Sequence, residues 1–273
     1  GQTGVIASAR LTLQPAPGNG MRVRERRMAR WDAFIEAFDA SPSTFSVGWI
    51  DATAKGADLG RGILEEAEIS QGSLRPAKKA KAVPLDAPGW ALAPPVVRAF
   101  NQWYYRRVPP QGRTVFKSFK DFFFPLDRIA DWNKLYGKRG FHQFQCVVPL
   151  AKVDALKSML EKIAASGLAS PLAVLKKMGP GQSGLMSFPM EGYTLAVDFP
   201  ARPEAERILS QLEADTAAAE GRIYLANDAL ASPEIIHGMY PGRGEWAAIA
   251  AQADPDSMLT TDLVRRLKLR EAA

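Results

Sequence analysis

The chain has 273 residues, of which 47% are hydrophobic and 23% are charged. This composition lies in the ordinary globular range and leaves enough apolar surface for one or two cores. A single cysteine, Cys146, excludes an internal disulfide framework and a cysteine-rich zinc site, and the two histidines, His142 and His237, leave little for a histidine-based centre, so we expect no metal.

Charge and hydropathy lead to expectations about the location of the protein and the ligands of its surface. No run of about 18 apolar residues occurs, and no secretory signal is recognisable at the N-terminus, so we expect a soluble, cytoplasmic protein, with association at a membrane surface as the alternative. The net charge of +6 is concentrated in basic patches between residues 22 and 120. Such patches attract nucleic acid, phosphorylated substrates or lipid headgroups, or they are simply a solvated basic face.

The first part of the chain predicts a strand, a helix and further strands. Residues 5–13 alternate as a strand, and the chain begins so abruptly, without methionine, that we expect a fragment of a longer protein. Residues 21–26 indicate a second strand, and apolar residues at helical spacing follow over 31–38. Strands are expected over 45–50 and 62–69, then a long connection over 73–110 with a short helix at 96–105.

The second part of the chain has a clearer order. The pattern predicts a short helix over 129–136, and then strand, helix, strand, strand, helix and strand. The strands are expected over 141–148, 172–178, 193–199 and 222–225, with the two helices ended by Gly167 and Gly221 and a helical tail from residue 232. This order is the ferredoxin-like βαββαβ unit, so the predicted fold class is α+β, an antiparallel sheet with both helices on one face. The first part resembles a partial copy that would extend the same sheet.

Polar residues on the predicted strands are the candidate site. In FHQFQCVVP the two-residue period places Gln143, Gln145 and Val147 on one face and His142, Phe144, Cys146 and Val148 on the other. With Lys176 and Thr194 from neighbouring strands, the face of the two glutamines would be a hydrogen-bonding floor for hydroxyls or a phosphate, or else an ordinary exposed sheet face. Asp198, just before a proline, is expected to fix the end of its strand.

The sequence contains no catalytic machinery of its own. There is no glycine-rich phosphate loop, histidine-containing triad or metal-ligand cluster, so any chemistry is expected to come from a cofactor. The segments NQWYYRR and FKSFKDFFFPLD place aromatic residues beside cations, as nucleic-acid surfaces do, although FFFP is more typical of a core.

Several segments occur in one order along the chain: SVGWIDA, QWYYR, FFFPLDRIADWNKLYGKRGFHQFQCVVP, LAVLKKMGPG, SFPMEGYTLAVDFP, GRIYLANDAL, HGMYPGRGEW and TDLVRRLKL. Together they resemble the C-terminal half of the decaprenylphosphoryl-ribose 2′-oxidase family, flavoproteins of the vanillyl-alcohol-oxidase type. The resemblance implies FAD as cofactor, residues 1–15 as the end of an FAD-binding domain, and residues 16–273 as a substrate-binding, flavin-capping domain. The C-terminal helices, 232–273, would pack back on the FAD domain. The pyrophosphate-binding part would precede Gly1, so the fragment alone should hold FAD poorly and be inactive.

The resemblance also implies an activity. A sugar hydroxyl of a small or lipid-linked substrate would lose a hydride to flavin N5 and become a ketone, and a partner reductase would complete an epimerisation; no nucleic-acid partner is expected. Physically this needs a hydride acceptor, a relay for the hydroxyl proton, and donors that fix the substrate. The residues implied as catalytic are Gln145, Lys176 and Tyr104; those implied as substrate-binding are Gln143, Thr194, Ala196 and Trp49; those implied as cofactor-binding are Gly4, Val5, Ile6, Tyr224 and Asn227.

Two positions depart from the family pattern. Asn227 stands where the family commonly has a lysine near the pyrimidine end of the flavin, so a hydrogen-bond donor replaces a charge. Ala196 stands where a characteristic cysteine would react with certain inhibitors. Redox behaviour and substrate are therefore expected to differ, and a pseudo-enzyme is a further interpretation. The alternative from another class is a ferredoxin-like binding module whose basic surface meets nucleic acid or anionic lipid.

Overall fold

The computed structural model describes residues 4–71, 80–181, 184–227 and 230–270. Its centre is an eight-stranded antiparallel sheet in the order β10-β7-β9-β8-β2-β3-β1-β5. The strands of this sheet are β1 (Gly20–Met28), β2 (Phe45–Ile50), β3 (Gly62–Ser70), β5 (Arg113–Ser118), β7 (Phe141–Val148), β8 (Ala173–Met178), β9 (Gly192–Pro200) and β10 (Arg222–Ile223). A separate parallel ladder joins β4 (Lys81–Ala82) to β6 (Ile129–Ala130).

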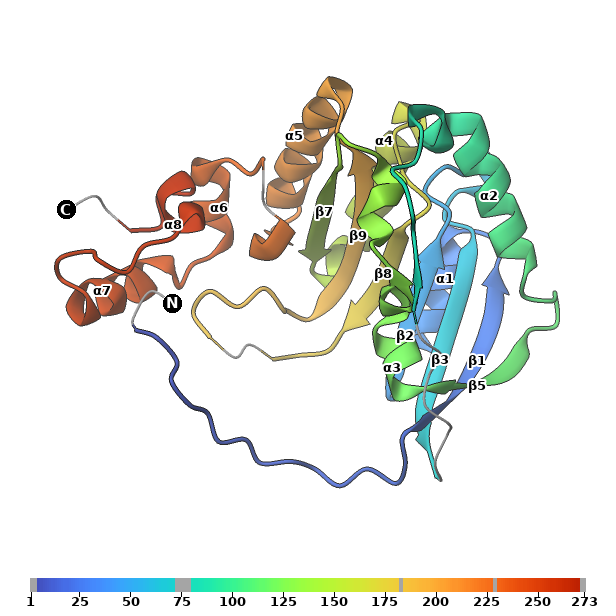
Figure 1. Ribbon diagram of the computed structural model, residues 1–273, viewed down its shortest axis with the longest axis horizontal. Helices are drawn as coiled ribbons and strands as arrows, with labels where there is room; N and C mark the ends of the chain where they lie inside the picture. The colour runs from blue at the N-terminus through green and yellow to red at the C-terminus, as the bar shows by residue number, and fades with distance from the viewer. Residues whose placement is uncertain (1–3, 72–79, 182–183, 228–229, 271–273) are drawn as a thin grey trace.

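The helices lie around this sheet (Figure 1). They are α1 (Trp31–Asp39), α2 (Pro94–Arg106), α3 (Phe119–Phe123), α4 (Val153–Ser166), α5 (Pro203–Ala218), α6 (Pro233–Met239), α7 (Arg243–Ala253) and α8 (Asp262–Arg266). Gly167 ends α4 in the left-handed conformation, at φ 68°, as the sequence predicted.

The sheet consists of two ferredoxin-like halves joined edge to edge. The second half runs β7-α4-β8-β9-α5-β10 along the chain and has the spatial order β10-β7-β9-β8. The first half has the equivalent strand order β5-β1-β3-β2. The two halves meet where β2 pairs with β8 at Gly48–Leu175 and Trp49–Val174. The predicted α+β class, the ferredoxin-like unit and the extension of its sheet by the first part are therefore confirmed.

One face of the sheet is apolar and packs against α1, α4 and α5. The strands contribute Phe144, Cys146, Leu195 and Val197, and the helices contribute Phe34, Leu156, Leu160, Ile163, Leu209 and Leu212. Because successive side chains of a strand point to opposite faces, the residues between these ones lie on the uncovered face. The packing of one sheet face against the helices therefore determines which strand side chains lie on the other face and are available for a site.

The N-terminal segment differs from the prediction. Residues 4–16 form no strand, and Val5 and Ile6 are 87% and 84% exposed. Figure 1 shows this segment as an extended arc (dark blue) outside the sheet. The predicted strand over 5–13 is wrong, because an alternating segment becomes a strand only when another strand pairs with its backbone.

Three further segments depart from the prediction. The helix expected over 129–136 is the short strand β6 followed by the 3₁₀ helix η4 (Trp132–Tyr136), since Asp131 between them has a left-handed φ of 56°. The strand expected over 222–225 is only β10, after which the 3₁₀ helix η6 (Leu225–Asn227) begins. The sequence pattern missed β5, and part of the connection expected over 73–110 lies outside the described residues.

The C-terminal helices belong to the same core as the second half. Ile236 and Met239 of α6 and Val264 of α8 are buried in it, and the Tyr240 hydroxyl donates to the Ile223 carbonyl at 2.5 Å. Figure 1 shows α6, α7 and α8 grouped at the β10 end of the sheet. Among the described residues, no helix is long and apolar enough to cross a bilayer.

Phe34 holds α1 against the join between the halves. Its ring lies so close to Gly48 and Gly62 that an added Cβ would be 2.5 Å and 2.7 Å from it. We expect Phe34→Ala to lower the free energy of unfolding by about 3–5 kcal/mol, because it leaves a cavity between helix and sheet. Urea unfolding measures this, with the exposed Glu36→Ala on the same helix as a control expected within about 0.5 kcal/mol of wild type. Equal stability of the two variants would contradict this account of the packing.

Candidate functional site

The uncovered face of the second half carries a patch that we call the polar floor. It comprises Gln143 and Gln145 of β7, Thr194, Ala196 and Asp198 of β9, Val174 and Lys176 of β8, and Trp49 of β2. The register places Gln145, Ala196 and Val174 in one row across the strands. Thr194 and Lys176 form the next row, and Gln143 is opposite Asp198. The prediction that both glutamines, Lys176 and Thr194 share one face is confirmed.

Gln145, on β7 at the side of the floor next to β10, is held by three contacts. Its Nε2 donates to Thr194 Oγ1 at 3.3 Å, and its Oε1 accepts from Asn227 Nδ2 at 3.1 Å. The Tyr224 backbone N–H donates to the backbone carbonyl of Gln145 at 2.9 Å, which brings η6 against β7. The amide of Gln145 therefore has a defined orientation, with one N–H and one lone pair left for a ligand.

Asp198 is the second fixed point of the floor. Its carboxylate accepts from Gln143 Nε2 at 2.8 Å and from the Tyr136 hydroxyl at 2.9 Å. Burial raises the pKa of Asp198 to about 6, although the hydrogen bonds from Tyr136 and Gln143 act to lower it. The backbone N–H of Asp198 donates to the Leu172 carbonyl, and the backbone N–H of Ser170 donates to the Asp198 carbonyl. These hydrogen bonds hold the end of β9 next to the start of β8, as the sequence led us to expect.

The network around Asp198 sets the direction of Gln143. Because Nε2 of Gln143 donates to the carboxylate, its carbonyl oxygen is left as an acceptor toward the open face. Tyr136 was missed in the sequence because it falls in a segment expected to be a helix. Its hydroxyl also lies 3.0 Å from Ser170 Oγ, and burial, followed by the Asp198 charge, raises its pKa.

Lys176 brings a positive charge to the floor. It is exposed, and its ammonium group has no hydrogen bond or ion pair to any residue that the structure describes. The next residue, Lys177, points to the opposite face and pairs with Asp39 at 2.5 Å. Lys177 is thus engaged in a structural ion pair, whereas Lys176, on the other face of β8, is available to a ligand.

Trp49 and Tyr104 form the edge of the floor toward the first half. Their ring centroids are 4.6 Å apart, and Trp49 Nε1 donates to the Pro171 carbonyl at 2.9 Å. Burial raises the pKa of Tyr104, while the nearby Arg107 acts in the opposite direction. The Tyr104 hydroxyl therefore stays protonated at neutral pH and is not a base there.

The structure does not bring every implied residue to the floor. Asn227 and Tyr224 do lie beside Gln145, and Tyr224 is partly exposed with its ring 4.8 Å from that of Phe188. Gly4, Val5 and Ile6 belong to the segment 4–16, which forms no helix or strand and which Figure 1 shows as an extended arc outside the sheet. Val5 and Ile6 are largely exposed in the described part of the chain, and the implied contact of all three residues with a cofactor stays a prediction.

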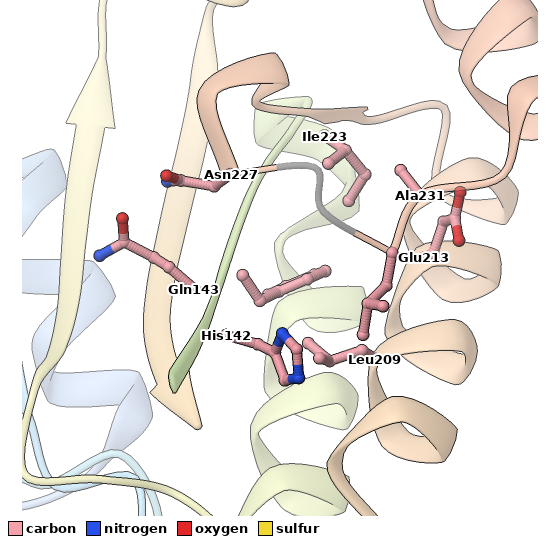
Figure 2. A pocket seen from close by; sticks show the side chains of 9 residues that line it. His142, Gln143, Leu209, Glu213, Ile223, Asn227 and Ala231 are labelled. Carbon is pink, nitrogen blue, oxygen red and sulfur yellow. The ribbon is translucent and has the colours of Figure 1, made fainter. Parts of the chain in front are cut away.

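A small cavity borders the floor where β10 ends. Figure 2 shows Gln143 and Asn227 on one side of β7, with His142 and Leu209 on the other. The cavity has a volume of about 30 Å³, enough for about one water molecule, and is too small for a sugar or a flavin. On the floor itself Lys176 is exposed and Gln143, Gln145 and Ala196 are partly exposed, whereas Thr194 and Asp198 are only 1% exposed. A ligand on the exposed part needs a cover from elsewhere.

The size and chemistry of the floor fit a planar ring with a polar edge. It extends about 13 Å along the strands and about 14 Å across the four strands. The small side chain of Ala196 lies in the middle of the floor, with the donors Gln145 and Asn227 on its β7 side and the donor Lys176 on its β8 side. Such donors match the carbonyl oxygens of an isoalloxazine edge or the hydroxyls of a sugar. Within the described part of the chain, no three His, Cys, Asp or Glu residues form a metal site.

The titration of Asp198 gives a test of this geometry. Its folded-state pKa of about 6 lies above the ordinary value of 3.8, so the stabilisation from its bound proton is lost as the pH rises through about 6. We expect the free energy of unfolding of the wild type, relative to Asp198→Asn, to fall by about 2–3 kcal/mol between about pH 4 and pH 7. Urea unfolding at each pH measures this difference. A constant difference would show that folding does not raise the pKa of Asp198.

Comparisons with known proteins show what the chain is similar to. The decaprenylphosphoryl-beta-D-ribose oxidase of Mycolicibacterium smegmatis (strain ATCC 700084 / mc(2)155) is 32% identical over 237 residues, which is 83% of this chain and 51% of that protein. A Streptomyces coelicolor protein, named only as an uncharacterized protein in the mprA 5′ region, is 29% identical over 98% of this chain and 78% of its own length. No protein-family model matches the chain.

A solved structure shows the same fold. The xylooligosaccharide oxidase from Myceliophthora thermophila C1, in complex with xylobiose, superposes with a TM-score of 0.53 at 10% identity, over 94% of this chain and 56% of that one. The chain thus spans about half the length of the oxidases that it matches. The resemblance carried by the sequence motifs is confirmed: the chain is a relative of decaprenylphosphoryl-beta-D-ribose oxidase and is similar in sequence to about half of that enzyme.

Proposed function

We propose that this chain is the C-terminal, substrate-binding and ring-covering part of an FAD-dependent oxidoreductase that oxidises a hydroxyl group of a sugar or sugar-like alcohol. The observation that carries the proposal is the polar floor, where Lys176 lies without a described partner in the row next to Gln145. The relatives support it, since decaprenylphosphoryl-beta-D-ribose oxidase and the xylooligosaccharide oxidase are FAD-binding flavoproteins.

FAD supplies the acceptor for the hydride that leaves the alcohol carbon. In this chain Gln145, Asn227 and Lys176 would hold the polar edge of its ring, with Tyr224 beside them. Asn227 already donates to Gln145, so it acts on the ring mainly by fixing that amide. Lys176 is then the residue of this group that brings a positive charge.

The chain's own residues would bind and orient the substrate. The carbonyl oxygen of Gln143 accepts from a substrate hydroxyl, since Asp198 occupies its amide nitrogen. The ammonium group of Lys176 would stabilise negative charge that develops on the reacting oxygen as its proton passes to solvent. Tyr104, protonated and packed on Trp49, closes the side of the floor toward the first half. These roles follow from charge and hydrogen-bonding capacity together.

The domain assignment belongs to the same proposal. The folded body begins at β1, and the arc before it exposes Val5, Ile6, Leu11 and Leu13. An FAD-binding part of the protein would cover these side chains and close over the polar floor. Oxidation of a lipid-linked sugar with a partner reductase remains the more specific form of the proposal, carried by the sequence resemblance.

The test uses the full-length protein that contains this chain. We expect it to bind FAD and to show loss of the flavin absorbance when mixed anaerobically with its sugar from a panel of pentoses, phosphorylated pentoses and xylooligosaccharides. Gln145→Ala and Lys176→Ala should each slow this reduction about 10²-fold, because each removes a contact to the reacting groups. Stopped-flow absorbance measures the rate.

Lys177→Ala is the matched control for Lys176→Ala. It removes the same charge from the same strand, but on the opposite face, where Lys177 pairs with Asp39. We expect its reduction rate to stay within about threefold of wild type, since surface ion pairs contribute little. A colourless full-length protein would refute the proposed function, and equal rates in the Lys176 and Lys177 variants would refute the site.

A further inference from the structure

A second cavity lies where β7 begins and β9 ends. It has a volume of about 320 Å³, which is large enough for a small organic molecule. Residues from three segments line it, 86–92, 135–140 and 200–202. We call this cavity the strand-end pocket.

Backbone contacts hold the three segments of the strand-end pocket together. The Ala87 N–H donates to the Lys134 carbonyl at 2.8 Å, and the Ala201 N–H donates to the Gly140 carbonyl at 3.0 Å. Gly137 has a φ of 68°, and a Cβ added to it would lie 2.8 Å from the Ala87 carbonyl oxygen. Glycine at this position therefore permits the close approach of the first two segments, and the pocket is preformed.

The charges of the strand-end pocket are not balanced. Three cations line it, Lys138, Arg139 and Arg202, with a single carboxylate, Asp86, which leaves a net charge of +2. Within the described part of the chain, none of these four side chains has a hydrogen bond or an ion pair. The guanidinium group of Arg139 reaches the first segment, with Nη2 3.9 Å from the position of a Cβ on Gly89. The cations are thus available to an anion from solution.

These groups favour a phosphate attached to a compact carbon body. Guanidinium groups bind two phosphate oxygens at once, and a lysine adds a further positive charge. A phosphate monoester carries a charge of about −1.5 to −2 at neutral pH, which matches the lining, whereas a carboxylate would match only half of it. Leu92, Leu135 and Pro200 add apolar surface for a ring or a short chain.

The strand-end pocket adjoins the polar floor but is distinct from it. None of the floor residues lines the pocket. Tyr136 does line it, and the Tyr136 hydroxyl donates to Asp198 of the floor at 2.9 Å. From the rise of a strand, Gly140 at the pocket is about 10 Å from Gln143 at the floor. A ligand in the pocket would therefore lie next to the floor without using Lys176.

We propose that the strand-end pocket binds a small phosphate monoester. The phosphate group lies between Lys138, Arg139 and Arg202, and the carbon body lies against the apolar wall. This binding goes beyond the proposed oxidation and does not depend on it, because it uses none of the residues that would hold the flavin or the reacting hydroxyl. A bound monoester also packs near Tyr136, whose hydroxyl helps to hold Asp198 in place.

Isothermal titration calorimetry of the full-length protein, as purified and without sugar, tests the proposal. The probe is phenyl phosphate, a monoester with a ring, and its two parts are tested separately as inorganic phosphate and phenol. We expect phenyl phosphate to bind more tightly than inorganic phosphate, because the ring contacts the apolar wall, and phenol not to bind measurably. Added salt should weaken the binding of phenyl phosphate.

Arg139→Gln and Arg202→Gln should each weaken the binding of phenyl phosphate at least about 10-fold, because each removes a charge-assisted hydrogen bond to the phosphate. Arg207→Gln is the matched control, since Arg207 is exposed on α5, near Arg202 in sequence, but does not line the pocket. Its affinity should stay within about threefold of wild type. Equal weakening in all three variants would show a general effect of net charge and would overturn the proposal.

Lys176→Ala tests whether the phosphate lies on the polar floor instead. Its affinity for phenyl phosphate should stay within about threefold of wild type, because Lys176 does not line the strand-end pocket. A loss of binding in this variant, with binding retained in Arg139→Gln and Arg202→Gln, would overturn the proposal. Absence of phenyl phosphate binding to the wild type would overturn it too. A colourless protein that still binds phenyl phosphate would refute the oxidation alone.

Discussion

The alternation of side chains along β7, β8 and β9 is the constraint on which the rest of the structure depends. Burial of Phe144, Leu175 and Leu195 against the helices requires the residues between them to face the other way. A shift of one residue in the pairing would place Gln145 and Lys176 in the core. The apolar packing therefore specifies the polar floor at the same time as it stabilises the fold.

The floor combines fixed groups with one free group. Gln145 and Gln143 are each oriented by a neighbour, Asn227 in one case and Asp198 in the other. Lys176 is not restrained in this way, so its ammonium group is able to adjust to a bound ligand. Two amides in defined directions and one mobile charge form a site that is largely pre-organised and can still respond to a ligand.

Much of this arrangement could be predicted from the sequence. The segment FHQFQCVVP shows its two faces directly, and Gly167 and Pro203 mark a helix end and a helix start. The common face of Gln145 and Lys176 followed from the strand period once the ferredoxin-like order was recognised. Local patterns are sufficient here because buried strands and amphipathic helices have strong periodicity.

The rest depended on contacts between distant segments. Tyr136 reaches Asp198 only because the chain turns at Asp131 and Gly137, which no periodic pattern indicates. The segment over 5–13 has a strand pattern but no strand beside it, whereas the strand β5 has its exposed Phe116 and no strong pattern. The contact between Asn227 and Gln145 likewise joins residues 82 positions apart.

The two ends of the sheet are closed in different ways, and this has a consequence for solubility. At one end, β10 is only two residues long and the Tyr240 hydroxyl occupies a carbonyl group of it. At the other end, β5 carries Arg113 and Lys117, which pair with the buried Glu25. A strand of another molecule that approached β5 would meet the charged side chains of Arg113 and Lys117. Short edge strands and charged edge strands both oppose edge-to-edge aggregation. The broad sheet can therefore leave one face uncovered for a ligand without becoming a template for self-association.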